Sequence, residues 1–72
     1  MTLNEAIREL YFWQHGNGDN FHSLLYTLIG KADPHNQRQL EMGFPNEVLA
    51  WQMWQNAKNP EAFFKYHGIP GD

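Results

Sequence analysis

Few side chains in this sequence could perform nucleophilic catalysis. That chemistry needs a Ser, Cys, Thr or Lys nucleophile, a base to activate it and a third group to orient the base. The chain has no cysteine and a single serine, Ser23, which directly follows His22. Adjacent helical residues point about 100° apart, so these two side chains cannot readily share a proton. The acidic residues show no converging pair either. We therefore expect no catalytic residue and no enzymatic activity.

The four histidines are the candidates for metal binding. His15, His22, His35 and His67 do not show the spacing that places two imidazoles on one helix face, and no thiolate supplements them. His15 and His67 each precede a glycine, which is typical of a helix end, where a histidine favours the negative end of the helix dipole. We expect no metal ion and no cofactor.

The composition indicates one small domain. The 72 residues are 42% hydrophobic, 15% aromatic and only 18% charged, with a formal net charge of −3. Without cysteine, stability must come from packing or from a partner. The first residues show no leader pattern, and the longest uninterrupted apolar runs are short. We expect a cytoplasmic chain with no membrane contact and no evident small-molecule substrate.

Helix start and stop signals divide the chain into short helices. Thr2 and Glu5 form a capping-box pattern, and Pro34, Pro45 and Pro60 each open a segment where proline is tolerated. The predicted elements are a helix from Thr2 to Gly16, a turn at 17–20, and helices at 21–31, 34–42, 45–57 and 60–67. The fold class is all-α, a compact single domain of four to five short helices over residues 1–68, followed by a tail at 69–72.

The second helix carries the clearest apolar stripe. Phe21, Leu24, Leu25, Leu28 and Ile29 occupy offsets 0, 3, 4, 7 and 8. This spacing is typical of a helix face that packs on a hydrophobic core. We expect all five side chains to face inward.

Aromatic residues exceed what so small a core is expected to bury. The segment 48–57 is apolar on nearly every side, and residues 11–13 spread over about 200° of helical arc. Aromatic side chains at a surface often mark protein interfaces. We therefore predict a protein-binding or self-association surface, and the alternative is a small core that uses many aromatics. The predicted interface residues are Tyr11, Phe12, Trp13, Trp51 and Trp54.

Nucleic-acid binding is an alternative hypothesis. The helix at 34–42 follows the second helix after a short turn and begins with His35, Asn36, Gln37 and Arg38, whose donors and acceptors suit base edges. Against this, the five basic residues are dispersed along a net-negative chain. A solvated helix start explains the same polar run.

Short phrases in the last two-thirds of the chain carry a resemblance. They include Leu28-Ile29-x-Lys31-Ala32-Asp33, Gly43-Phe44-Pro45-x-Glu47-Val48-x-Ala50-Trp51 and Phe63-Phe64-x-x-His67-Gly68-Ile69. In these phrases the chain resembles small bacteriophage and prophage proteins of unknown function. The resemblance implies a phage or prophage origin and action by binding other proteins, and it implies no particular site residue.

Together these observations favour a small non-enzymatic protein-interaction module, a phage or prophage accessory or host-directed factor that uses an aromatic surface. Two alternatives remain. One is a helix-turn-helix-like nucleic-acid-binding accessory, and the other is a structural component of a larger assembly.

Overall fold

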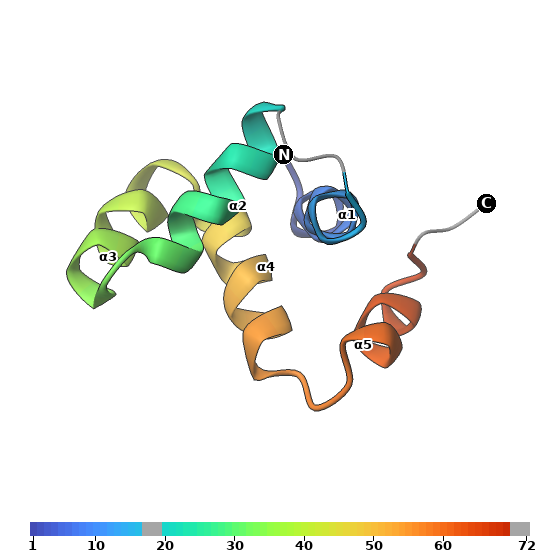
Figure 1. Ribbon diagram of the computed structural model, residues 1–72. Coiled ribbons are helices and arrows are strands. Elements are labelled where there is room, and N and C mark those ends of the chain that lie inside the picture. Colours follow the sequence, from blue (N-terminus) through green and yellow to red (C-terminus); the bar gives the residue numbers. More distant parts are fainter. Residues whose placement is uncertain (17–19, 70–72) are drawn as a thin grey trace.

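Five helices and no strand lie in the residues that the structure, a computed structural model, describes, which are 1–16 and 20–69. Their bounds are α1 Leu3–Gln14, α2 Phe21–Lys31, α3 Pro34–Gly43, α4 Pro45–Asn56 and α5 Pro60–Tyr66 (Figure 1). The all-α prediction is confirmed. The predicted turn at 17–20 lies outside the described ranges except for its last residue, as does the predicted tail beyond residue 69.

Polar side chains cap four helix starts. The hydroxyl of Thr2 accepts from the backbone N–H of Glu5 at 3.1 Å, and the Glu5 carboxylate accepts from the Thr2 N–H at 2.8 Å. This reciprocal pair is the predicted capping box. The hydrogen bond from the Thr2 backbone lowers the pKa of the Glu5 carboxyl. Asn20, Asp33 and Asn59 cap α2, α3 and α5 in the same way through their side-chain oxygens.

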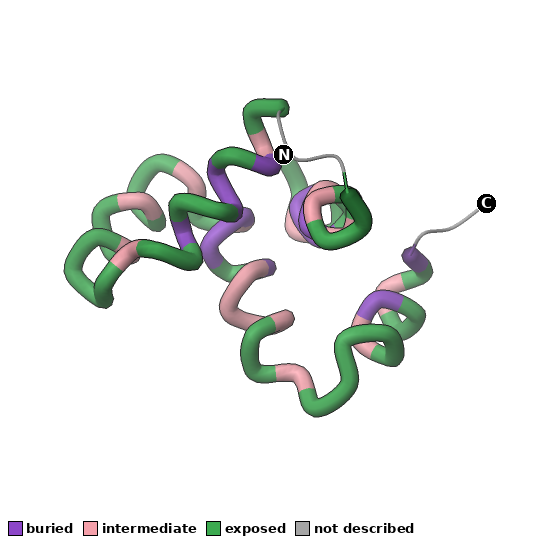
Figure 2. Tube along the Cα trace, viewed as in Figure 1, coloured by how far each residue is buried: buried purple, intermediate pink, exposed green. Residues whose placement is uncertain are grey.

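Helix α4 lies at the centre of the molecule. It contacts α1, α2 and α3, and α1 also contacts α2. Figure 2 shows buried segments of α1, α2 and α4 facing one another. Since its sequence is apolar on nearly every side, a central place gives α4 the neighbours it needs. The core consists of Ala6, Ile7, Leu10, Leu25, Tyr26, Ile29, Val48, Ala50, Phe64 and Ile69.

The end of α5 is fastened to the core by a left-handed glycine. Gly68 has φ of 73°, its N–H donates to the Lys65 carbonyl at 2.9 Å, and the Ile69 N–H donates to the Phe64 carbonyl at 2.9 Å. This is the Schellman arrangement, and its two apolar ends, Phe64 and Ile69, are buried. The Phe64 ring lies 5.1 Å from that of Tyr11 on α1. Ile69, assigned to the tail from the sequence, is therefore part of the core.

The prediction that five apolar side chains of α2 face inward is wrong at three of the five positions. Leu25 and Ile29 are buried, whereas Phe21, Leu24 and Leu28 are exposed. The apolar stripe of α2 is present, but only the side of it that carries Leu25 and Ile29 faces the core.

Contacts on the opposite flank of α2 set this rotation. Tyr26 is fully buried, and its hydroxyl donates to the Ala6 carbonyl of α1 at 2.6 Å. Ser23 is buried next to it on the same helix face. Because this small residue and the Tyr26 hydrogen bond turn α2 toward α1, the outer half of the apolar stripe is left facing solvent.

Candidate functional site

An apolar groove runs between α2 and α3. We call it the α2–α3 groove; it measures about 360 Å³ and is lined by Phe21, Leu24, Leu25, Leu28, Leu40 and Phe44. The rings of Phe21 and Phe44, whose centroids are 5.9 Å apart, meet at one end. The described residues that line this groove include no charged side chain. Its surface is suited to bind an apolar ligand or an apolar surface of another protein.

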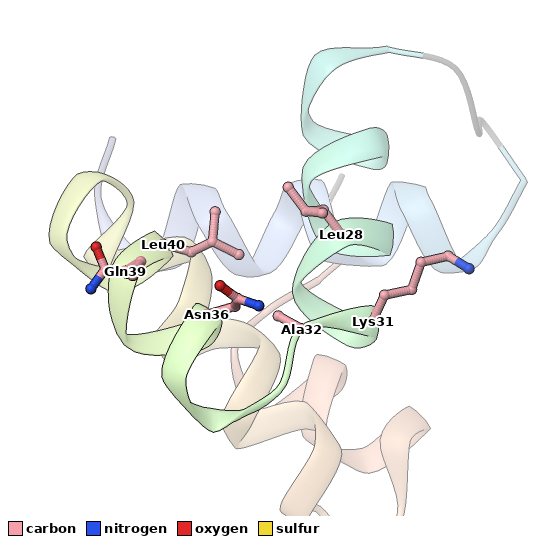
Figure 3. Close-up of a pocket in the computed structure, with 6 residues that line it drawn as sticks. All are labelled: Leu28, Lys31, Ala32, Asn36, Gln39 and Leu40. Atoms are coloured by element: carbon pink, nitrogen blue, oxygen red, sulfur yellow. The ribbon is translucent and has the colours of Figure 1, made fainter.

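A second hollow of about 270 Å³ continues the groove toward the α2–α3 connection. It shares Leu28 and Leu40 with the α2–α3 groove and adds the polar residues Lys31, Asn36 and Gln39. Figure 3 shows Leu28 and Leu40 pointing toward each other between the helices, while the Lys31 side chain extends away from the hollow. The groove thus has an apolar middle and a polar end.

The composition of α3 explains why the stripe of α2 stays uncovered. No residue of α3 is buried, although its Leu40 packs partly against the core. The Gln37 amide donates to the Ile29 carbonyl of α2 at 3.2 Å, and Gln52 of α4 donates to the Gln37 side-chain oxygen at 3.4 Å. Leu40 and Met42 are the only large apolar residues of α3, so few apolar side chains are available to cover the exposed leucines.

The residues predicted for nucleic-acid binding fall into two groups. His35, Asn36 and Arg38 are exposed at the start of α3. Gln37 is half-buried and makes the two hydrogen bonds described above, so its amide is occupied within the protein. Nucleic-acid binding through this helix stays a prediction.

The five residues of the predicted aromatic interface are partly covered by one another and by the core, and binding through them stays a prediction. The ring centroids of Trp13 and Trp54 are 5.7 Å apart, and those of Trp54 and Trp51 are 6.2 Å apart. Both pairs pack edge to face. The Trp13 indole donates to the Thr27 hydroxyl at 3.0 Å, whereas the Trp51 and Trp54 indole nitrogens are buried without a hydrogen-bond partner among the described residues. Of the five predicted residues, Phe12 is exposed and the others, Tyr11, Trp13, Trp51 and Trp54, are half-buried.

A polar cluster that is partly open to solvent joins α1, α2 and α4. His22 Nδ1 lies 3.5 Å from Glu9 Oε1, and His22 Nε2 lies 3.9 Å from Glu47 Oε2. Burial, and then the nearby Glu47 and Glu9 carboxylates, raise the pKa of the Tyr26 phenol. Within residues 1–16 and 20–69, no three His, Cys, Asp or Glu side chains are grouped to hold a metal ion. The cluster connects three helices, with Glu47 buried and the His22 and Glu9 side chains partly exposed.

The exposed half of α2 is the feature that sequence reasoning missed. One signal could have found it. The segment 34–43 contains only two large apolar residues, Leu40 and Met42, which are too few to cover Phe21, Leu24 and Leu28.

The chain matches no protein-family model, no curated protein and no solved structure. None of the described helices has the length and apolar character needed to cross a membrane.

Proposed function

We propose that the chain is a small non-enzymatic protein-interaction module that binds an apolar helical face of a protein in the α2–α3 groove. The observation that carries this proposal is the exposure of three adjacent large side chains, 62% for Phe21, 58% for Leu24 and 51% for Leu28. Single exposed apolar residues are ordinary, whereas a contiguous stripe beside an apolar groove is a mark of an interface.

The chemistry of the groove selects the kind of partner. An amphipathic helix presents apolar side chains at the spacing that an elongated apolar groove accommodates. Phe21 and Phe44 supply aromatic anchors of the type that dominates binding energy at interfaces. Polar side chains at the far end, such as Asn36 and Gln39, provide a rim that stays hydrated.

This proposal differs from the sequence-based prediction in the surface that it uses. The tryptophans contact one another, and their packing against the core supports a stabilising role. The groove instead offers side chains that are more than half exposed. A role as a phage or prophage accessory or host-directed factor, as the resemblance implies, is part of the proposal.

Site-specific photo-cross-linking in living bacterial cells tests the proposal. A benzophenone-bearing phenylalanine analogue at Phe21, where the side chain is 62% exposed, has room for its added benzoyl group and places the reactive ketone at the α2–α3 groove. The matched control carries the same analogue at Tyr66, an aromatic position that is 86% exposed on α5.

We expect illumination to give a discrete protein adduct from the Phe21 position and only background from the Tyr66 position. Equal labelling at both positions, or no adduct from Phe21, would overturn the proposed function.

A further inference from the structure

We propose that the protein bound in the α2–α3 groove is a second copy of this chain, packed through an antiparallel α2–α2 contact about a two-fold axis beside Leu24. This inference rests on the proposed function and names its partner. It assigns the exposed half of α2 to a symmetric dimer interface.

This face carries a ridge of apolar side chains next to a groove. A two-fold dimer uses the same patch on both copies, so the patch must carry both a ridge and a groove that receives it. Phe21, Leu24 and Leu28 form a ridge along α2, and the groove beside it is closed on the far side by Leu40 and Phe44. In antiparallel packing, Phe21 of one copy meets Leu28 of the other, and Leu24 meets its own counterpart.

The area of the patch agrees with what a stable dimer needs. From their exposed fractions, the three ridge residues present about 300 Å², and the half-buried Leu40 and Phe44 raise the patch to about 400 Å². A standard interface buries about 800 Å² on each partner, of which slightly more than half is apolar. Complete burial of the patch would therefore supply most of the apolar part of one side of such an interface.

Charge favours the antiparallel orientation. The chain has a net charge of −3, but the described residues that line the groove are uncharged, so two copies meet there without like-charge contact. Lys31 stands at one end of α2, at the edge of the adjoining hollow, and its side chain extends away from the hollow (Figure 3). Parallel packing would place the two Lys31 side chains together, whereas antiparallel packing puts them at opposite ends of the interface. Antiparallel helices also align their dipoles favourably.

Thiol cross-linking of the full chain tests this geometry, because the native sequence contains no cysteine. Leu24→Cys puts two thiols beside the axis, where a short bismaleimide can join them. The matched control is Leu49→Cys, at a leucine on α4 that is 42% exposed and does not line the groove. Far-ultraviolet circular dichroism verifies that both variants are folded.

We expect Leu24→Cys to form covalent dimers at least about tenfold faster than Leu49→Cys, since the dimer raises the local thiol concentration. A mixture of Phe21→Cys and Leu28→Cys chains should give mixed dimers in preference to dimers of either one. Equal rates for Leu24→Cys and Leu49→Cys would overturn the dimer, and preferential self-linking of Phe21→Cys would overturn the antiparallel orientation.

The two proposals fail in different ways. If Leu24→Cys does not link to itself while the photo-cross-linker at Phe21 captures a different protein, the dimer is wrong and the proposed function stands. If neither probe captures any protein, both are wrong.

Discussion

Two glycines show how local surroundings decide the effect of a single methyl group. Gly30 lies within α2, and a Cβ there would be 3.5 Å from Cζ2 of Trp51, an ordinary van der Waals contact. Gly68 has a left-handed φ of 73°, which side-chain-bearing residues adopt at a cost. The first glycine is therefore replaceable, and the second is required by the end of α5.

We expect Gly30→Ala to stabilise the fold by about 0.5–1 kcal/mol, because alanine loses less backbone freedom on folding and gains contact with Trp51. Its melting temperature should rise by about 3–6 °C in a domain of this size. Gly68→Ala should instead destabilise by about 1 kcal/mol. Thermal unfolding followed by circular dichroism measures both, and a lower melting temperature for Gly30→Ala would contradict the packing described for Trp51.

Tyr26 makes the stability sensitive to alkaline pH. Burial raises the pKa of its phenol above the ordinary value of 10.0. The unfolded chain therefore ionises at this residue before the folded chain does, so the stabilisation is complete below pH 10 and declines as pH rises above it. Urea unfolding at a series of pH values should show this decline.

Replacement of the phenol isolates this contribution. We expect Tyr26→Phe to lower the free energy of unfolding near neutral pH by about 1 kcal/mol, since it removes the hydrogen bond to Ala6, and to flatten the decline above pH 10. Tyr66→Phe, at an exposed ring, is the control that should keep the wild-type profile. If the free energy of unfolding of Tyr26→Phe declines above pH 10 as steeply as that of the wild type, another group causes the decline.

At the level of elements, α5 depends on the buried pair that follows its end. Ile69 and Phe64 are each 2% exposed and close the Schellman turn. We expect Ile69→Ala to lower the free energy of unfolding by about 2–4 kcal/mol, because it leaves a cavity in the core. Helix α5 should then unfold locally before the other helices. Hydrogen exchange should show faster exchange of α5 amides with smaller changes in α2 and α4. A uniform loss of protection in all helices would mean that α5 is not a separate unit of stability.

Helix starts could be predicted from the sequence, but the orientation of a helix about its own axis could not. Thr2, Asp33 and Asn59 act on backbone groups three residues away, so their effect is visible in a short window of sequence. The rotation of α2 depends on the distant hydrogen bond from Tyr26 to Ala6. For the same reason the groove could not be predicted, since the spacing of Leu24 and Leu28 on α2 is that of a core-facing stripe.

At the scale of the whole molecule, the residues that hold the fold differ from those proposed to meet a partner. Leu24 is 58% exposed, so its replacement by a charge should not disturb the core. We expect Leu24→Glu to change the free energy of unfolding of the monomer by no more than about 0.5 kcal/mol. Urea unfolding at low protein concentration measures this, with Met42→Glu, at an exposed α3 residue that does not line the groove, as the control. A loss of several kcal/mol specific to Leu24→Glu would place this residue in the core.

Sedimentation equilibrium across a range of concentrations measures directly whether the chain forms a dimer. The wild-type chain and Met42→Glu should approach a mass of twice the 8.5 kDa of one chain, and Leu24→Glu should remain at the mass of one chain. A wild-type protein that stays at one chain mass at the highest concentration, or a Leu24→Glu variant that associates as the wild type does, would contradict dimerisation through the α2–α3 groove.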